Sequence, residues 1–139
     1  MMKNPAETIG KLIDAQSVSF ISSVDEGGYP NTKAILAPVK REGIQTFYRH
    51  TNSPSVKVRQ YRHNPKACVY FCDQRFFRGV MLKGTMEVLD DEVTKKDIWK
   101  DEFSMYYEGG RDGGDFIILK FTAESGRYYS NFKSEDFEI

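Results

Sequence analysis

Short β-prone runs separated by turn residues restrict the fold of this sequence more than any other feature. Val18–Val24 has the two-residue alternation of a strand and is followed by the turn sequence DEGG at 25–28. A second run covers Asn31–Val39 and a third covers Ile44–Arg49, with REG at 41–43 as the turn between them. Because the links are short, the three strands are expected to form an antiparallel meander.

The second half of the sequence predicts further strands. Lys66–Cys72 is almost continuously apolar, which predicts a strand that is buried on both faces. Phe76–Leu89 is long enough to bend across two sheets, with Gly79 and Gly84 as the expected bend points. The last two strands are expected at Phe116–Ala123 and Gly126–Phe132, followed by an acidic tail.

Three helices are expected around these strands. Asn4 and Pro5 supply the N-cap and the first helical position of the first helix. The second helix lies within 55–65, and the third is capped by Asp90 or Asp91. Six or seven mostly sequential strands with peripheral helices predict a mainly β (α+β) fold, built as a small antiparallel barrel.

Chain length and charge limit the possible classes of function. The 139 residues are expected to form one domain over 1–139. The 20 basic and 20 acidic residues cancel, so no global field attracts the chain to nucleic acid or to an anionic membrane. No apolar run approaches the roughly 20 residues of a spanning helix, and the N-terminus lacks the apolar core of a signal peptide. We therefore expect a cytoplasmic protein.

The cysteines and histidines do not predict a metal site. On one strand, Cys68 and Cys72 would lie on the same face but about 13 Å apart, which is too far for a disulfide. Their spacing is not the C-x-x-C of zinc or redox motifs, and His50 and His63 do not complete a ligand set. Both cysteines are interpreted as small core or half-buried residues.

The stretch from Phe47 to Pro65 predicts an anion site. It is expected to run from a strand through a polar loop into a helix that Ser55 caps. The first N–H groups of a helix lack intrahelical partners, and the helix dipole is positive at the same end. With the hydroxyl groups of Thr51, Ser53 and Ser55 and the ammonium group of Lys57, the loop has the chemistry to hold a phosphate monoester. The alternative is an ordinary capped helix with a solvated basic face.

The order of these motifs resembles that of the pyridoxamine 5′-phosphate oxidase-like family, the FMN-binding split barrels. KAIL at 33–36 is similar to the family's strand that lines the flavin, and FYRHTNSPSVKVRQYRHNPKACVYF at 47–71 is similar to its phosphate-binding run. RGVMLKGTMEVL at 78–89 resembles the strand that follows. The likeness covers roughly residues 15–90, and the last third resembles the short general-stress-protein-type members.

The resemblance implies a six- to seven-stranded antiparallel split β-barrel, Greek-key-like, that forms a homodimer with FMN at the subunit interface. Thr51, Ser55 and Lys57 would then bind the FMN phosphate, and Lys33 could serve the same phosphate. Backbone groups of 34–36 would face the isoalloxazine ring or the ribityl chain. The partner subunit would contribute the residues that follow the strand ending at Cys72, whose alternative role is a solvated turn. The candidate cofactor-binding residues are Lys33, Ala34, Ile35, Leu36, Thr51, Asn52, Ser53, Ser55, Val56, Lys57, Gln74, Arg75 and Arg78.

The sequence departs from the family at its substrate-binding positions. Pro38 stands where the oxidases have a substrate-binding lysine, and the C-terminal Arg-x-His motif is absent. Val56 replaces a basic residue, which predicts a weaker grip on the phosphate. Without cations for a second phosphate, true pyridoxamine 5′-phosphate oxidase activity is not expected.

Three functions are compatible with these residues. The first is an FMN-dependent oxidoreductase that acts on NAD(P)H or an unidentified small substrate, with no catalytic acid or base that the sequence identifies. The second is a non-catalytic flavin- or haem-binding module, such as a sensor, a reservoir or a stress protein. The third is a structural dimeric barrel with an empty cleft.

Overall fold

The structure is a computed structural model that describes residue 2 and residues 4–139. Its helices are α1 (Pro5–Asp14), α2 (Val56–His63), α3 (Glu92–Ile98) and the 3-10 helix η1 (Asp101–Met105). Its strands are β1 (Val18–Val24), β2 (Pro30–Leu36), β3 (Lys40–Glu42), β4 (Thr46–Asn52), β5 (Lys66–Asp73), β6 (Arg78–Leu89), β7 (Phe116–Ser130) and β8 (Lys133–Glu138). None of these helices has the length and apolar character needed to cross a bilayer.

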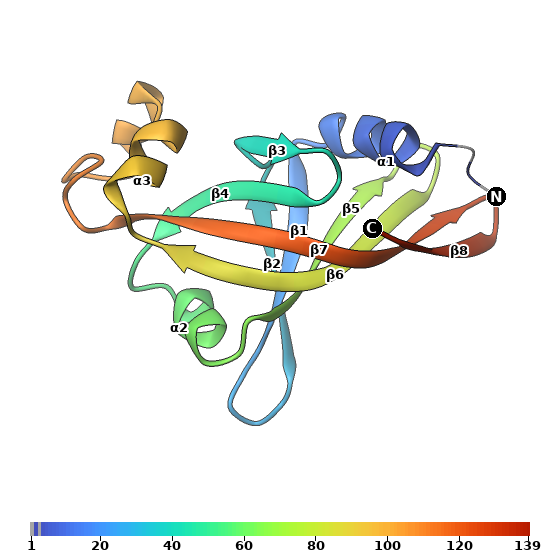
Figure 1. Cartoon of the computed structure of the whole chain (residues 1–139), viewed down its shortest axis with the longest axis horizontal. Coiled ribbons are helices and arrows are strands. Elements are labelled where there is room, and N and C mark those ends of the chain that lie inside the picture. Colours follow the sequence, from blue (N-terminus) through green and yellow to red (C-terminus); the bar gives the residue numbers. More distant parts are fainter. Residues whose placement is uncertain (1, 3) are drawn as a thin grey trace.

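The strands form one antiparallel sheet in the order β2-β1-β5-β6-β7-β4-β3, with β8 paired to β7. The long strands β6 and β7 run across the whole molecule (Figure 1). One part of this pair lies between β5 and β8, and the other part of β7 pairs with β4. The register shifts at Lys83/Gly84, where Glu124 on β7 is skipped. The sheet therefore bends at this bulge, and the fold is the predicted split β-barrel.

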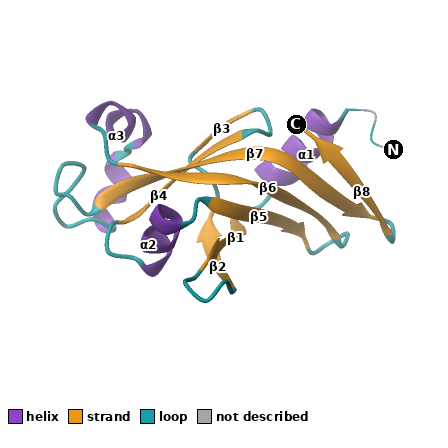
Figure 2. Cartoon of the chain, turned by 60° about the horizontal axis from the view of Figure 1, so that its bottom comes forward, coloured by secondary structure: helices purple, strands orange, loops and turns teal. Residues whose placement is uncertain are grey.

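The helices lie on the outside of the strands, with α1 and α3 toward opposite ends (Figure 2). Helix α1 packs near β5, α2 near β1 and β6, and α3 near β4 and β7. The predicted N-cap of α1 is confirmed, since Asn4 Oδ1 accepts a hydrogen bond from the backbone N–H of Glu7 at 3.2 Å. Of the two alternatives for α3, Asp91 is the N-cap.

Side chains on the inner faces of the strands form two hydrophobic clusters. The larger contains Phe47, Phe71 and Phe121, whose ring centroids lie 5.8 and 6.2 Å apart around Phe47. The smaller lies under α3 and η1 and contains Ile98, Phe103, Tyr107, Phe116 and Ile118. The second cluster brings the segment after α3 against one end of β4 and β7.

The predicted three-strand meander is wrong. Strands β1 and β2 do pair, but β4 pairs with β7, and only the short β3 stands beside it. The predicted second strand ends at Leu36 because Pro38 cannot donate a hydrogen bond to a ladder. The third then pairs with the centre of the sheet, where Phe47 lies opposite Phe121.

Two further predictions about strands need correction. The strand β5 is fully buried on one face only, since Ala67, Val69 and Phe71 are buried whereas Tyr70 on the other face is 39% exposed. The last two predicted strands are one continuous strand, because 124–125 forms the bulge and not a turn. The acidic tail adds β8, and the predicted turn at 41–43 lies partly in the short strand β3. The described residues therefore form eight strands, where six or seven were predicted.

Candidate functional site

A cleft of about 540 Å³ lies where β2, the end of β4 and the start of α2 meet the segment after η1. Seven of the predicted cofactor-binding residues line it, although they come from three separate elements. The cleft is lined by Val18, Lys33, Ala34, Ile35, Leu36, His50, Thr51, Asn52, Lys57, Tyr106, Tyr107 and Asp115. The structure thus brings residues 33–36 of β2 into the same cleft as Thr51, Asn52 and Lys57 of the predicted anion site.

The chain reaches the cleft through a strand-to-helix connection. Strand β4 continues to Asn52, three residues beyond the predicted end, so Thr51 lies on the strand and not in a loop. The backbone N–H of Ser53 then donates to the carbonyl oxygen of Asp115 at 2.8 Å, which ties the connection to the start of β7. Ser55 is the N-cap residue of α2 with an extended backbone, as predicted. Lys57 therefore stands on the first turn of the helix.

The hydroxyl group of Ser55 has no hydrogen-bond partner. Its side chain makes no capping bond to α2, although its backbone occupies the N-cap position. Its Oγ atom is fully buried and unpartnered among the described residues. Leaving such a group unsatisfied costs about 1–3 kcal/mol, so native structures rarely do so without a reason. An oxygen-rich ligand at the start of α2 would supply the missing partner.

The electrostatics of the cleft also favour an anion. Burial lowers the pKa of Lys57, and the positive charge of Lys33 lowers it further. Neither lysine forms an ion pair in the described part of the chain. Two neighbouring ammonium groups without a counter-ion repel each other, and a bound phosphate would relieve that repulsion. The residues present therefore fit the phosphate group of FMN.

The remaining predicted residues lie outside this cleft. Ser53 and Ser55 are half-buried and are not among the residues that line it, and Val56 lines a different groove on the outside of α2. Gln74 and Arg75 belong to the β5–β6 turn and Arg78 begins β6, and none of the three lines the cleft in the same chain. The Arg75 and Arg78 guanidinium groups lie 5.0 and 5.2 Å from the centroid of the Phe76 ring. Arg78 also pairs with Asp73 at 2.6 Å.

The sequence did not predict that His50, Tyr106 and Tyr107 form the other wall of the cleft. His50 Nδ1 lies 2.7 Å from the hydroxyl group of Tyr107, and its ring lies 4.1 Å from that of Phe103. Burial lowers the pKa of His50, so the imidazole is neutral near pH 7. Burial, followed by the charge of Asp115, raises the pKa of Tyr107 to about 12, so the phenol keeps its proton. In the sequence, residues 103–107 form an apolar patch rich in aromatic side chains, but their pattern predicts no particular secondary structure.

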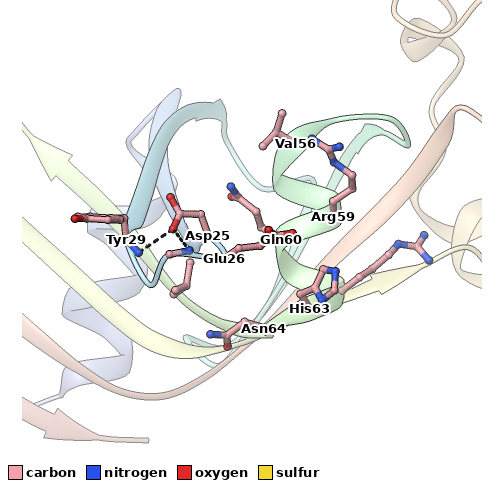
Figure 3. A pocket seen from close by; sticks show the side chains of 11 residues that line it. Asp25, Glu26, Tyr29, Val56, Arg59, Gln60, His63 and Asn64 are labelled. Atoms are coloured by element: carbon pink, nitrogen blue, oxygen red, sulfur yellow. Dashed lines mark hydrogen bonds between the residues drawn. The ribbon is translucent and has the colours of Figure 1, made fainter.

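A larger groove of about 770 Å³ lies between the β1–β2 turn and the outer face of α2 (Figure 3). Asp25 is used within its own turn, because its carboxylate accepts hydrogen bonds from the N–H groups of Gly27 and Tyr29 at 3.0 and 2.9 Å. The ring of Tyr29 extends away from the helix, while Arg59 lies beside Val56 on the opposite wall (Figure 3). Binding sites need polar groups that converge, so the smaller cleft is the better candidate.

Comparison with known proteins identifies the family. The family model of pyridoxamine 5′-phosphate oxidase matches residues 6–130. The chain belongs to this family. A curated pyridoxine/pyridoxamine 5′-phosphate oxidase of Legionella pneumophila is 33% identical over 72 residues, which cover 52% of this chain but only 33% of that protein.

Solved structures agree with this assignment. A protein related to general stress protein 26, of the pyridoxinephosphate oxidase family, from Clostridium acetobutylicum is 35% identical with a TM-score of 0.89. The alignment covers 100% of this chain and 97% of that protein. A heme binding protein from Mycobacterium smegmatis has a TM-score of 0.78 at 15% identity, with 99% of this chain and 59% of that chain covered. The second likeness concerns the fold alone.

Proposed function

We propose that this member of the pyridoxamine 5′-phosphate oxidase family binds FMN in the cleft and is a flavin-dependent oxidoreductase for NAD(P)H or an unidentified small substrate. The observation that carries the proposal is that Lys33 and Lys57 both line the cleft and that neither forms an ion pair with another described residue. The buried, unpartnered hydroxyl group of Ser55 supports it. Both features suit a phosphate that has three acceptor oxygens and up to two negative charges.

The residues of the cleft have distinct roles in this proposal. Lys57, Lys33, Thr51, Ser55 and the first N–H groups of α2 hold the phosphate. Strand β2 is the edge of the sheet, so its backbone groups facing away from β1 are free to orient the ribityl chain or the ring at 34–36. A bound flavin supplies hydride or electron transfer. The protein supplies binding, orientation and limited access of water.

The substrate is expected to differ from that of the vitamin-metabolism enzymes. Pro38 offers no charge at the position where the oxidases have a substrate-binding lysine, and β8 carries no Arg-x-His motif. A second phosphate would therefore lack cationic partners in this chain. We infer that a small substrate other than NAD(P)H carries no phosphate monoester of the kind that the vitamin-metabolism enzymes recognise.

Titration of the purified protein with FMN and riboflavin tests the proposal. FMN is expected to bind more tightly than riboflavin because only FMN carries the phosphate, and NAD(P)H is expected to bleach the absorption of the bound flavin. Bound flavin that no reductant bleaches would favour the sensor or reservoir. An absorption spectrum of a haem complex in place of flavin would favour the haem-binding alternative, and absence of binding would leave the structural barrel.

We also propose that FMN lies at the interface of a homodimer. The outer face of β1, β2 and β5 exposes Val18, Phe20, Leu36 and Tyr70, at 46%, 37%, 55% and 39%. Strand β2 is exposed along nearly its whole length, which is unusual for a stable edge strand. A second copy on this face would cover both, and its Gln74, Arg75 and Arg78 could reach the cleft.

Sedimentation is expected to give a dimer for the wild-type protein. Phe20→Glu should convert it to a monomer with weakened flavin binding, because it places a charge in the apolar face. Val93→Glu on α3 is the matched control, since Val93 is 79% exposed away from that face, and it should remain a dimer. A wild-type monomer that binds FMN tightly would contradict the shared site.

A further inference from the structure

Within the described part of the chain, Arg49 on β4 is a buried charge without an acidic partner. The residue is 2% exposed, and its Nη2 donates to Ser19 Oγ at 2.6 Å. Its Nε and Nη1 atoms are fully buried and have no hydrogen-bond partner among the described residues. Its guanidinium group lies 5.6 Å from the centroid of the Phe71 ring. Its hydrogen-bond partner is a serine, and no ion pair among the described residues includes it.

The register of the strands places this guanidinium group behind the wall of the cleft. Arg49 precedes Thr51 by two residues on β4, so both side chains point to the same face, about 7 Å apart along the strand. At the far end, Ser19 pairs with Ile35 and follows Val18 in the chain, and both of these residues line the cleft. Arg49 therefore spans from β4 to β1 on the strand face that also carries Thr51 and Ile35, two residues that line the cleft.

A structural role alone explains this arrangement poorly. A buried ion without a counter-charge destabilises a fold, and apolar residues of similar volume often replace such ions without loss of stability. Burial lowers the pKa of Arg49 to about 10, which still leaves the group charged near pH 7. Its hydrogen bond to Ser19 satisfies one of three nitrogen atoms. Residues that reduce stability in this way are concentrated at functional sites.

We propose that Arg49 is a positioning residue that supplies positive charge from beneath the cleft and thereby selects ligands with an anionic end. The anion would be held between the solvent-side lysines and this buried guanidinium group. The low dielectric of the interior lets such a charge act over several ångströms. That the anion is the phosphate of FMN rests on the proposed function. The preference for a negative charge does not.

The test compares Arg49→Met with Arg49→Lys. In Arg49→Met, the FMN dissociation constant is expected to rise by roughly tenfold, because a unit charge at this range in a protein interior has an effect of that order. The dissociation constant of riboflavin should stay within about twofold, since riboflavin has no anionic end. The melting temperature of the ligand-free variant should be equal or higher. Arg49→Lys should retain most of the FMN affinity, and Arg59→Met on the outer face of α2 is the control for loss of an arginine.

The stability readout separates this role from a structural one. If the only role of Arg49 is to connect β4 to β1, Arg49→Met should lower the melting temperature. It should also weaken the binding of FMN and riboflavin equally, or leave both unchanged. Each of these results would overturn the inference. Titration with inorganic phosphate separates it from the proposed function. Phosphate that stabilises the wild type but not Arg49→Met would support the role of Arg49 even if FMN does not bind. Equal stabilisation of both proteins by phosphate, or none in either, would refute it.

Discussion

Replacing Lys57 and Ser55 together by alanine is expected to weaken FMN binding by about 2–4 kcal/mol, or roughly 30- to 700-fold. In the proposed complex, Lys57 would donate a charge-assisted hydrogen bond to the phosphate, and Ser55 would offer a buried hydroxyl group that has no other partner among the described residues. Riboflavin should lose little affinity in the same variant, because it lacks the phosphate. Fluorescence titration of both ligands measures the difference. The control is Arg59→Ala, which removes an exposed cation on the opposite side of α2.

The pH dependence of binding provides a second readout for Lys57. Its pKa is lowered in the ligand-free protein by burial and by Lys33, whereas a bound phosphate favours the ammonium form and raises it. FMN affinity should therefore be greatest below the lowered pKa and fall as the pH rises through it. Measurements should start well above about pH 6, where the phosphate itself titrates. If the folded double variant binds FMN as tightly as the wild type, or shows the same pH dependence of FMN binding, the phosphate binds elsewhere.

The largest effect on stability is expected for Gly84→Ala, with a loss of about 3 kcal/mol or more in the free energy of unfolding. A Cβ atom at this position would lie 1.9 Å from the carbonyl oxygen of Thr122 and 2.9 Å from Cα of Ala123. Both are backbone atoms of β7, so no side chain can move aside. The β6–β7 pair would have to open at its bulge, where the two halves of the barrel meet.

Urea unfolding measures this loss, and Gly28→Ala is the matched control. Gly28 has a φ of +83° in the β1–β2 turn, and apart from its two chain neighbours no described residue has an atom within 4 Å of the place that a Cβ atom would take. Its replacement should cost only about 1–2 kcal/mol through backbone conformation. Equal losses in the two variants would mean that the close approach at Gly84 does not limit stability.

Local patterns in the sequence were sufficient for much of the fold. The N-cap at Asn4, the start of α2 after Ser55 and the full extent of β1 depend on near neighbours, and the structure has all three. The fold class followed from the number of short strands and from the family resemblance. The roles of the predicted site residues stay predictions until ligand binding is measured.

The sequence alone did not predict which strands pair across long distances in the chain. The apolar alternation of β4 indicates a strand but does not say whether β2 or β7 lies beside it. The exposure of Tyr70 on the outer face of β5 was not predictable either. A continuously apolar strand can be buried on both faces, or it can expose apolar side chains on one face.

The sequence by itself determined which polar groups gather at the predicted anion site, since the hydroxyl groups of Thr51 and Ser55 and the ammonium group of Lys57 lie within seven residues of one another. Only the tertiary structure decided what surrounds that loop. It brought Tyr107 to His50 across 57 positions and Arg49 to Ser19 across 30. The physical reason is that strand pairing and burial depend on contacts between distant segments, whereas caps, turns and charge patterns act within a few residues.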